Sequence, residues 1–174
     1  VSLSLFVLLF VAGARKRHLL LLAGGGGFLL AYGIMHADYR IARLLSFLDP
    51  AAHQQTGGYQ LSQSLLAFGA GGMNGVGLGE SQQKMFYLPE AHTDFVFAVL
   101  GEETGLWGTG GILLLFGLLG GRGVRVALRH PHAFGRLLAC GCTFLLVGQA
   151  GLNMAVALGM LPTKGLPLPF ISYG

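Results

Sequence analysis

The sequence predicts an all-α polytopic membrane protein, a bundle of transmembrane helices with one large outer loop that contains short amphipathic helices. Its 174 residues are 53% hydrophobic and only 10% charged, whereas soluble domains carry about 25% charged residues. The apolar residues lie in runs long enough to cross a bilayer. Basic residues concentrate in short segments between these runs, and 30 glycines suit close helix packing.

Four apolar segments define the predicted spans of a single membrane domain covering residues 1–174. They lie at about 1–12, 18–35, 95–121 and 137–158. A bilayer core takes roughly 20 apolar residues, so the third segment is long enough to tilt or to lie partly at the interface. The chain starts inside an apolar run and stops at Gly174. We therefore expect both ends to continue in a longer protein, which makes the first span a truncated one.

Basic residues orient these spans. The loops at about 13–17 and 122–136 contain no acid, and their basic residues are Arg15, Lys16, Arg17, Arg122, Arg125, Arg129 and Arg136. The loop at about 38–94 is much poorer in Lys and Arg for its length. The positive-inside rule therefore places the two short loops in the cytoplasm, and the long loop and the 160–174 hairpin outside. Basic residues divided among short loops do not indicate a nucleic-acid-binding face.

The outer loop contains two recognisable segments. Residues 61–68 are apolar at roughly helical spacing, which predicts a short amphipathic helix at the membrane surface. The glycine-rich run 69–79 has two interpretations: an ordinary turn-rich loop, or backbone N–H groups that cradle a phosphate. It lacks a Walker A pattern, and no predicted strand precedes it.

A cluster of polar side chains stands directly before the third span: Glu90, His92, Thr93 and Asp94. Ionisable groups at a membrane boundary cost stability, which favours a functional explanation. Each residue also has a simpler interpretation. Asp94 suits a helix N-terminus, Thr93 an N-cap, Glu90 a solvated loop charge and His92 a structural histidine. Glu102 and Glu103 lie inside or near the same span; their burial would need partners, and we expect structural hydrogen bonds to helices outside the chain.

The 160–174 hairpin contains a cation, Lys164, among three prolines that exclude a regular helix. Irregular backbone at membrane depth must be buried in protein or line a cavity. Lys164 is either a snorkelling lysine or a point charge for a phosphate. No residues have metal-ligand spacing, and Cys140 and Cys142, one residue apart, suit neither a redox nor a zinc motif.

Several of these segments together resemble the SEDS family of bacterial membrane proteins. The resemblance is carried by the segments Gly58-Tyr59-Gln60, Gln63-Ser64-Leu65, Gly77-Leu78-Gly79, Leu88-Pro89-Glu90-Ala91-His92-Thr93-Asp94-Phe95, Gly101-Glu102-Glu103, Leu161-Pro162-Thr163-Lys164-Gly165-Leu166 and Pro169-Phe170-Ile171-Ser172-Tyr173-Gly174. It extends over nearly the whole chain. The segments around Glu90 and Lys164 resemble the cell-division members more than the elongation members.

The resemblance implies a ten-helix protein of the bacterial cytoplasmic membrane, acting at the division septum. This chain would cover roughly the sixth to ninth helices and the start of the tenth, with 38–94 as the large periplasmic loop. The family polymerises lipid II into glycan strands beside a class B penicillin-binding protein and other division proteins. The family's catalytic aspartate falls on Asp94. Lys164, Glu90, His92 and Thr93 are then candidate substrate-binding residues.

Some alternatives stay open beside this resemblance. The same features suit a lipid II flippase, an elongation-type polymerase of the family, or a scaffold that recruits the transpeptidase. No cofactor is firmly implied, although Mg²⁺ held jointly by a substrate pyrophosphate and one carboxylate suits such chemistry. We expect the fragment alone to be inactive.

Overall fold

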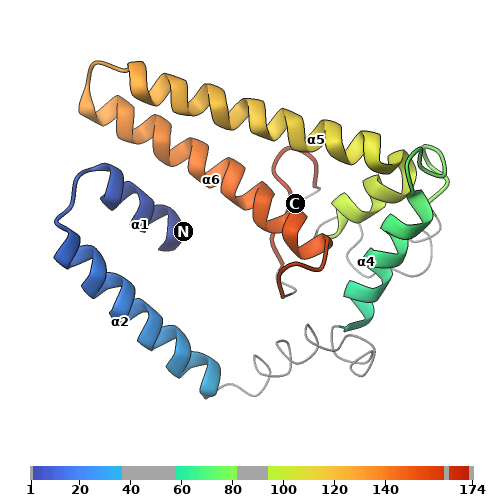
Figure 1. The fold of residues 1–174 in the computed structure, drawn as a ribbon, viewed down its shortest axis with the longest axis horizontal. Helices are drawn as coiled ribbons and strands as arrows, with labels where there is room; N and C mark the ends of the chain where they lie inside the picture. The colour runs from blue at the N-terminus through green and yellow to red at the C-terminus, as the bar shows by residue number, and fades with distance from the viewer. Residues whose placement is uncertain (1, 37–57, 82–93, 163–164, 173–174) are drawn as a thin grey trace. The chain divides into compact units, whose positions relative to one another are not determined.

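The computed structural model describes residues 2–36, 58–81, 94–162 and 165–172 (Figure 1). Its helices are α1 (Ser2–Val11), α2 (Lys16–Met35), α4 (Gly58–Gly71), α5 (Val96–Arg129) and α6 (Ala133–Ala157). Within these ranges there is no strand. Two described helices, α5 and α6, are long and apolar enough to cross a membrane. The predicted fold class, an all-α polytopic membrane protein, is confirmed.

The helix bounds follow the predicted segments, with one correction. Helix α4 contains the amphipathic segment predicted at 61–68, and α1, α2 and α6 match their segments to within a few residues. Helix α5 runs on to Arg129 and α6 begins at Ala133, so 122–129 and 133–136, which belong to the predicted loop 122–136, are helical. Arginine is a good helix former whose long side chain carries its charge to water, so basic residues need not end a helix. The membrane boundaries and the sidedness of the loops remain predictions.

The chain divides into two compact units, and α5 and α6 each contribute to both. One unit comprises 1–41 and 117–148, and the other comprises 42–116 and 149–174. In the first unit, the end of α5 and the start of α6 approach through small residues. A Cβ placed on Gly120 would contact Val147 at 3.6 Å, and one placed on Gly123 would overlap Thr143. Gly141 similarly lies against Leu8 of α1. Small residues at such crossings let membrane helices pack closely.

The second unit contains two apolar clusters, which hold α4, the first part of α5 and the end of α6 together. The first cluster consists of Ala67, Phe95, Ala98, Val99 and Val156. The second consists of Phe97, Phe116, Ala150, Met154, Ala157 and Leu168. Phe68 of α4 packs against both clusters. The fully buried Ser64 hydroxyl also donates a 2.6 Å hydrogen bond to the Ala157 carbonyl, which ties α4 to the last turn of α6.

Helix α5 bends sharply at Gly105, which has φ 64° and ψ −156°. A residue in this region of backbone space breaks the helix, and glycine adopts it at little cost. The break exposes carbonyl groups that the glycine-rich loop satisfies. Val76 N–H donates to Glu102 O at 2.9 Å, and Gly77 N–H donates to Glu103 O at 3.2 Å. Leu106 N–H returns a bond to Gly72 O at 3.0 Å.

These bonds bear on the two interpretations of the run 69–79. Besides Val76 and Gly77, the N–H groups of Gly75 and Glu80 also donate to main-chain carbonyls. Because these donors are occupied within the loop and at the bend, the structure favours the turn-rich loop over a phosphate cradle. The run stabilises the bend in α5 through these main-chain hydrogen bonds.

Candidate active site

Asp94 stands directly before α5, where the described chain resumes. The first turn of α5 is closed by bonds to the Phe95 carbonyl, from Ala98 N–H at 2.9 Å and Val99 N–H at 3.3 Å. Phe95 and Phe97 are almost fully buried, so the backbone beside Asp94 is anchored in the core. Asp94 itself is only half-buried. A carboxylate in such a position exchanges some of its water for protein groups and still reaches a substrate.

The carboxylate of Asp94 lies against the hairpin that follows α6. A Cβ built on Gly165 would lie 3.0 Å from Asp94 Oδ2 and 3.8 Å from Oδ1. A glycine therefore leaves just enough room for the carboxylate beside the hairpin backbone. Residues 71 positions apart in sequence are thus neighbours, and Gly165 directly follows Lys164 in the sequence.

Asn153 of α6 connects these two segments. Its Nδ2 donates to the Asp94 carbonyl oxygen at 2.8 Å and to the Leu166 carbonyl oxygen at 2.6 Å. The side chain is 2% exposed, and its Oδ1 is buried with no hydrogen-bond partner among the residues that the structure describes. A buried amide that uses both N–H groups in this way fixes the two backbones at one separation.

Two further contacts hold the hairpin. Gln149, one helical turn before Asn153, donates from Nε2 to the Pro167 carbonyl at 2.9 Å. Leu168 is buried in the second apolar cluster, and its N–H donates to Ser172 Oγ at 2.8 Å. The irregular backbone predicted at 160–174 is thus supported by side-chain amides and by core packing, as irregular backbone at membrane depth requires.

The other predicted site residues cannot be placed. Glu90, His92, Thr93 and Lys164 lie outside the described residues, so their roles stay predictions. The structure does bring the predicted base, Asp94, next to the residue that follows Lys164.

Glu102 has a hydrogen-bond partner within the chain. It is 2% exposed, and it accepts a hydrogen bond at Oε2 from the hydroxyl of Ser81, which is also buried. One partner for this carboxylate therefore comes from the segment before α5 in the same chain, while bonds to helices outside the chain stay a prediction. The bend at Gly105 makes this contact possible, because it places Glu102 and Glu103 in a short arm against the loop and not within a continuous span.

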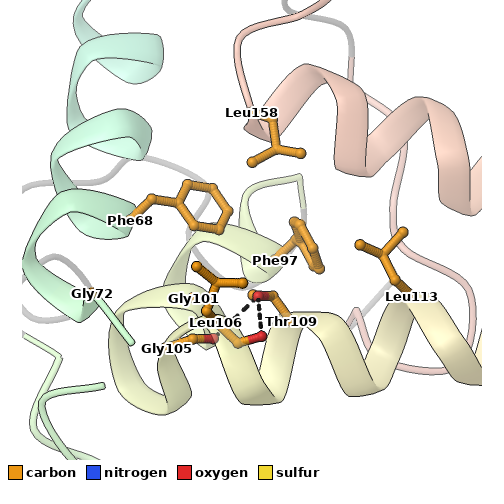
Figure 2. A pocket seen from close by; sticks show the side chains of 9 residues that line it. All are labelled: Phe68, Gly72, Phe97, Gly101, Gly105, Leu106, Thr109, Leu113 and Leu158. Carbon is orange, nitrogen blue, oxygen red and sulfur yellow. Dashed lines mark hydrogen bonds between the residues drawn. The ribbon is translucent and has the colours of Figure 1, made fainter. Parts of the chain in front are cut away.

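An apolar cavity of about 380 Å³ lies at the bend (Figure 2). Its walls are Phe68 and Gly72 from α4 and the turn after it, Phe97, Gly101, Gly105, Leu106, Thr109 and Leu113 from α5, and Leu158 after α6. The one hydroxyl among these residues, on Thr109, bonds to the Gly105 and Leu106 carbonyls at 3.1 and 3.2 Å. The cavity thus offers no free polar side chain for recognising a head group.

The described residues offer few metal ligands. No three His, Cys, Asp or Glu side chains gather in that part of the chain. Near the hairpin, Asp94 supplies one carboxylate, which is fewer ligands than an all-protein cage needs. Mg²⁺ commonly binds one or two carboxylates together with substrate phosphates and waters. The described residues therefore supply at most one carboxylate to such a metal ion beside the hairpin.

Sequence reasoning missed Gln149, Asn153 and Ser81. The first two carried a usable signal, because they are carboxamides spaced i, i+4 in an otherwise apolar helix. Carboxamides in membrane helices commonly form hydrogen bonds between elements. Ser81 carried no such signal.

Comparison with known proteins places these features in context. The family model for FtsW, RodA and SpoVE, described as "Cell cycle protein", matches residues 1–174. The chain is 51% identical over 174 residues to the "Probable peptidoglycan glycosyltransferase FtsW" of Geobacter sulfurreducens, and 48% identical over 177 aligned positions to the protein of that name in Legionella pneumophila. Each alignment covers 100% of this chain but only 47% and 45% of the relative. The chain thus spans about half the length of these relatives.

A solved structure also contains a chain that is similar to this one. It comes from work on the structural coordination of polymerization and crosslinking by a peptidoglycan synthase complex. One chain in it superposes on 98% of this chain with a TM-score of 0.76 and 35% sequence identity. The match covers 47% of that chain.

Proposed function

This chain belongs to the FtsW/RodA/SpoVE family of cell cycle proteins, and we propose that it carries the catalytic base of a lipid II-dependent peptidoglycan glycosyltransferase of the division type. The observation that carries the proposal is the Asp94 carboxylate beside Gly165, with the main chains of the two segments joined by Asn153. The names of the relatives support the same activity. Because the chain spans about half of those relatives, the activity is proposed for the protein that contains it.

The proposed reaction is a one-step inverting glycosyl transfer. The 4-hydroxyl of the acceptor sugar attacks the anomeric carbon of the donor, so a new C–O bond forms as the bond from that carbon to the lipid pyrophosphate breaks. Asp94 accepts the hydroxyl proton, and the pyrophosphate leaves with the electron pair of the broken bond. The half-buried position of Asp94 suits a carboxylate that must act as a base.

Charge on the leaving pyrophosphate needs stabilisation. We assign that role to Lys164, because the next residue in the sequence, Gly165, lies beside the Asp94 carboxylate. A Mg²⁺ held jointly by the substrate pyrophosphate and one carboxylate other than the base would supply further charge neutralisation. Glu90, His92 and Thr93 are proposed to shape the same site from the segment directly before Asp94.

The test compares two carboxylate-to-amide changes in the full-length protein. Asp94→Asn should abolish polymerisation of purified lipid II in detergent, while Glu80→Gln, at an exposed acid of the outer loop, should leave it near the wild-type rate. Near-normal turnover by Asp94→Asn would refute the assignment of the base. Polymer formed in detergent also excludes a protein that only flips lipid II, since no bilayer is present to be crossed.

We further propose that the protein acts beside a class B penicillin-binding protein at the division septum. Support comes from the division-type names of the relatives and from the similarity to a chain of a synthase complex that couples polymerization to crosslinking. Fluorescence localisation of the tagged full-length protein tests this placement. A signal spread along the lateral wall would favour the elongation-type alternative.

A further inference from the structure

A basic cavity lies at the junction of α5 and α6, within the unit formed by 1–41 and 117–148. It is an open, shallow cavity of about 410 Å³, lined by the exposed residues Arg122, Arg125, Val126, Arg129, His130 and Pro131. The site proposed above uses none of these residues.

Three arginines give the cavity its charge. Arg122, Arg125 and Arg129 are spaced three and four residues apart, so they share one face of α5 over about 10 Å of its axis. The sequence has no acidic residue after Glu103. Within the described part of the chain, the structure gives these three guanidinium groups no ion pair and no hydrogen bond. Neighbouring like charges repel, and a bound anion removes that repulsion.

The turn that follows the arginines is ordered by local contacts, although its residues are exposed. The His130 ring packs so closely on Gly135 that a Cβ there would overlap it. Its Nδ1 lies 3.2 Å from both the main-chain N and O of His132. These contacts fix the turn that contributes His130 and Pro131 to the lining, so a ligand would find part of its site already ordered.

The surroundings indicate which anion fits. Around the cavity, large apolar side chains are exposed on both helices, among them Leu128 at 77% and Phe134 at 78%. Both helices are able to cross a membrane. A soluble anion gains nothing from this apolar surface, whereas a phospholipid places its phosphate among the arginines and its acyl chains on the leucines and phenylalanine.

We propose that this cavity binds the phosphodiester head group of an anionic phospholipid at the predicted cytoplasmic face. Guanidinium groups bind phosphate oxygens in a two-pronged geometry that a lysine cannot reproduce. The site is separate from the proposed glycosyltransferase site, so either proposal can fail without the other.

The experiment uses the full-length protein in nanodiscs containing equal amounts of phosphatidylglycerol and phosphatidylcholine. Native mass spectrometry counts the lipids that remain bound after release. Arg125→Gln and Arg129→Gln should each lower retained phosphatidylglycerol at least threefold. The matched control is Arg136→Gln, which removes the same charge from an exposed arginine in the first turns of α6 that does not line the cavity. Arg136→Gln should retain as much phosphatidylglycerol as the wild type. Arg125→Lys should retain an amount between those of the wild type and Arg125→Gln.

Three results would overturn the proposal. If Arg125→Gln and Arg136→Gln lose equal amounts of retained phosphatidylglycerol, the arginines act only as a general positive surface. Equal retention of the two lipids by the wild type would remove the anionic selectivity. Displacement of phosphatidylglycerol by millimolar inorganic phosphate would point to a soluble anion. Thermal unfolding of each variant checks its fold, and if Arg125→Gln does not fold, Arg129→Gln against Arg136→Gln decides.

Discussion

The Asn153 side chain donates one hydrogen bond to the carbonyl of Asp94 and another to the carbonyl of Leu166, at 2.8 and 2.6 Å. One buried amide on α6 therefore sets the distance between the start of α5 and the hairpin after α6. Because the proposed base lies on one of these segments and Lys164 on the other, this contact governs the geometry of the proposed site.

Replacing Asn153 should be more costly than replacing Gln149. Asn153→Ala leaves two part-buried carbonyls without their donor, which should cost less than the roughly 1–3 kcal/mol of a fully buried group left unsatisfied. Gln149→Ala removes one bond from a less buried residue. We expect the full-length Asn153→Ala protein to melt at a lower temperature and to polymerise lipid II more slowly than Gln149→Ala. The reverse order in both assays would contradict the role given to Asn153.

Gly165→Ala should impair activity more than stability. The new Cβ would lie 3.0 Å from Asp94 Oδ2, so the carboxylate or the hairpin must shift by a few tenths of an ångström. Misplacement on the ångström scale can reduce catalysis by about a hundredfold. Gly151→Ala on α6 is the matched control, because no atom lies within 4 Å of its Cβ position. Initial rates of lipid II polymerisation, normalised to folded protein, distinguish the two variants.

Gly105→Ala should destabilise the bend in α5. Its φ of 64° disfavours a side chain, and the Cβ would lie 2.5 Å from Gly75 N and 2.6 Å from Met73 O. Backbone strain of this kind costs about 1–3 kcal/mol, and the clash adds to it. Gly110→Ala, with open space at its Cβ, should instead be neutral or stabilise the helix by up to about 1 kcal/mol. The two variants are compared by the yield of folded protein after detergent extraction. Equal yields from Gly105→Ala and Gly110→Ala would refute the requirement for glycine at position 105.

Phe68→Ala should loosen α4 from α5. The Phe68 ring lies 5.7 Å from that of Phe97 and lines the apolar cavity (Figure 2). Truncating a fully buried phenylalanine costs about 3–5 kcal/mol, and the half-buried Phe68 should cost less. Hydrogen exchange of the α4 amides should accelerate in this variant. Leu66→Ala, at a 58% exposed position, should leave exchange unchanged, and acceleration of the same size there would contradict the contact.

Much of the fold follows from local sequence. Runs of apolar residues predict α2, α5 and α6, and the helical spacing of 61–68 predicts α4, because burial of one face and backbone satisfaction in lipid depend on neighbours along the chain. The bend at Gly105 was not predictable in this way. In a sequence with 30 glycines, only the packing of the loop 72–77 shows which one leaves helical geometry.

The sequence by itself determined the membrane class of this protein, and its resemblance to the SEDS family indicated Asp94 as the candidate base. Only the tertiary structure decided that Asp94 lies beside Gly165, that Asn153 joins the two segments, and that Ser81 bonds to Glu102. The physical reason is the separation along the sequence over which each kind of information acts. Hydropathy and helix periodicity act over a few turns, whereas each of these contacts joins residues 13 to 71 positions apart, brought together by the end of α6 and the bend in α5.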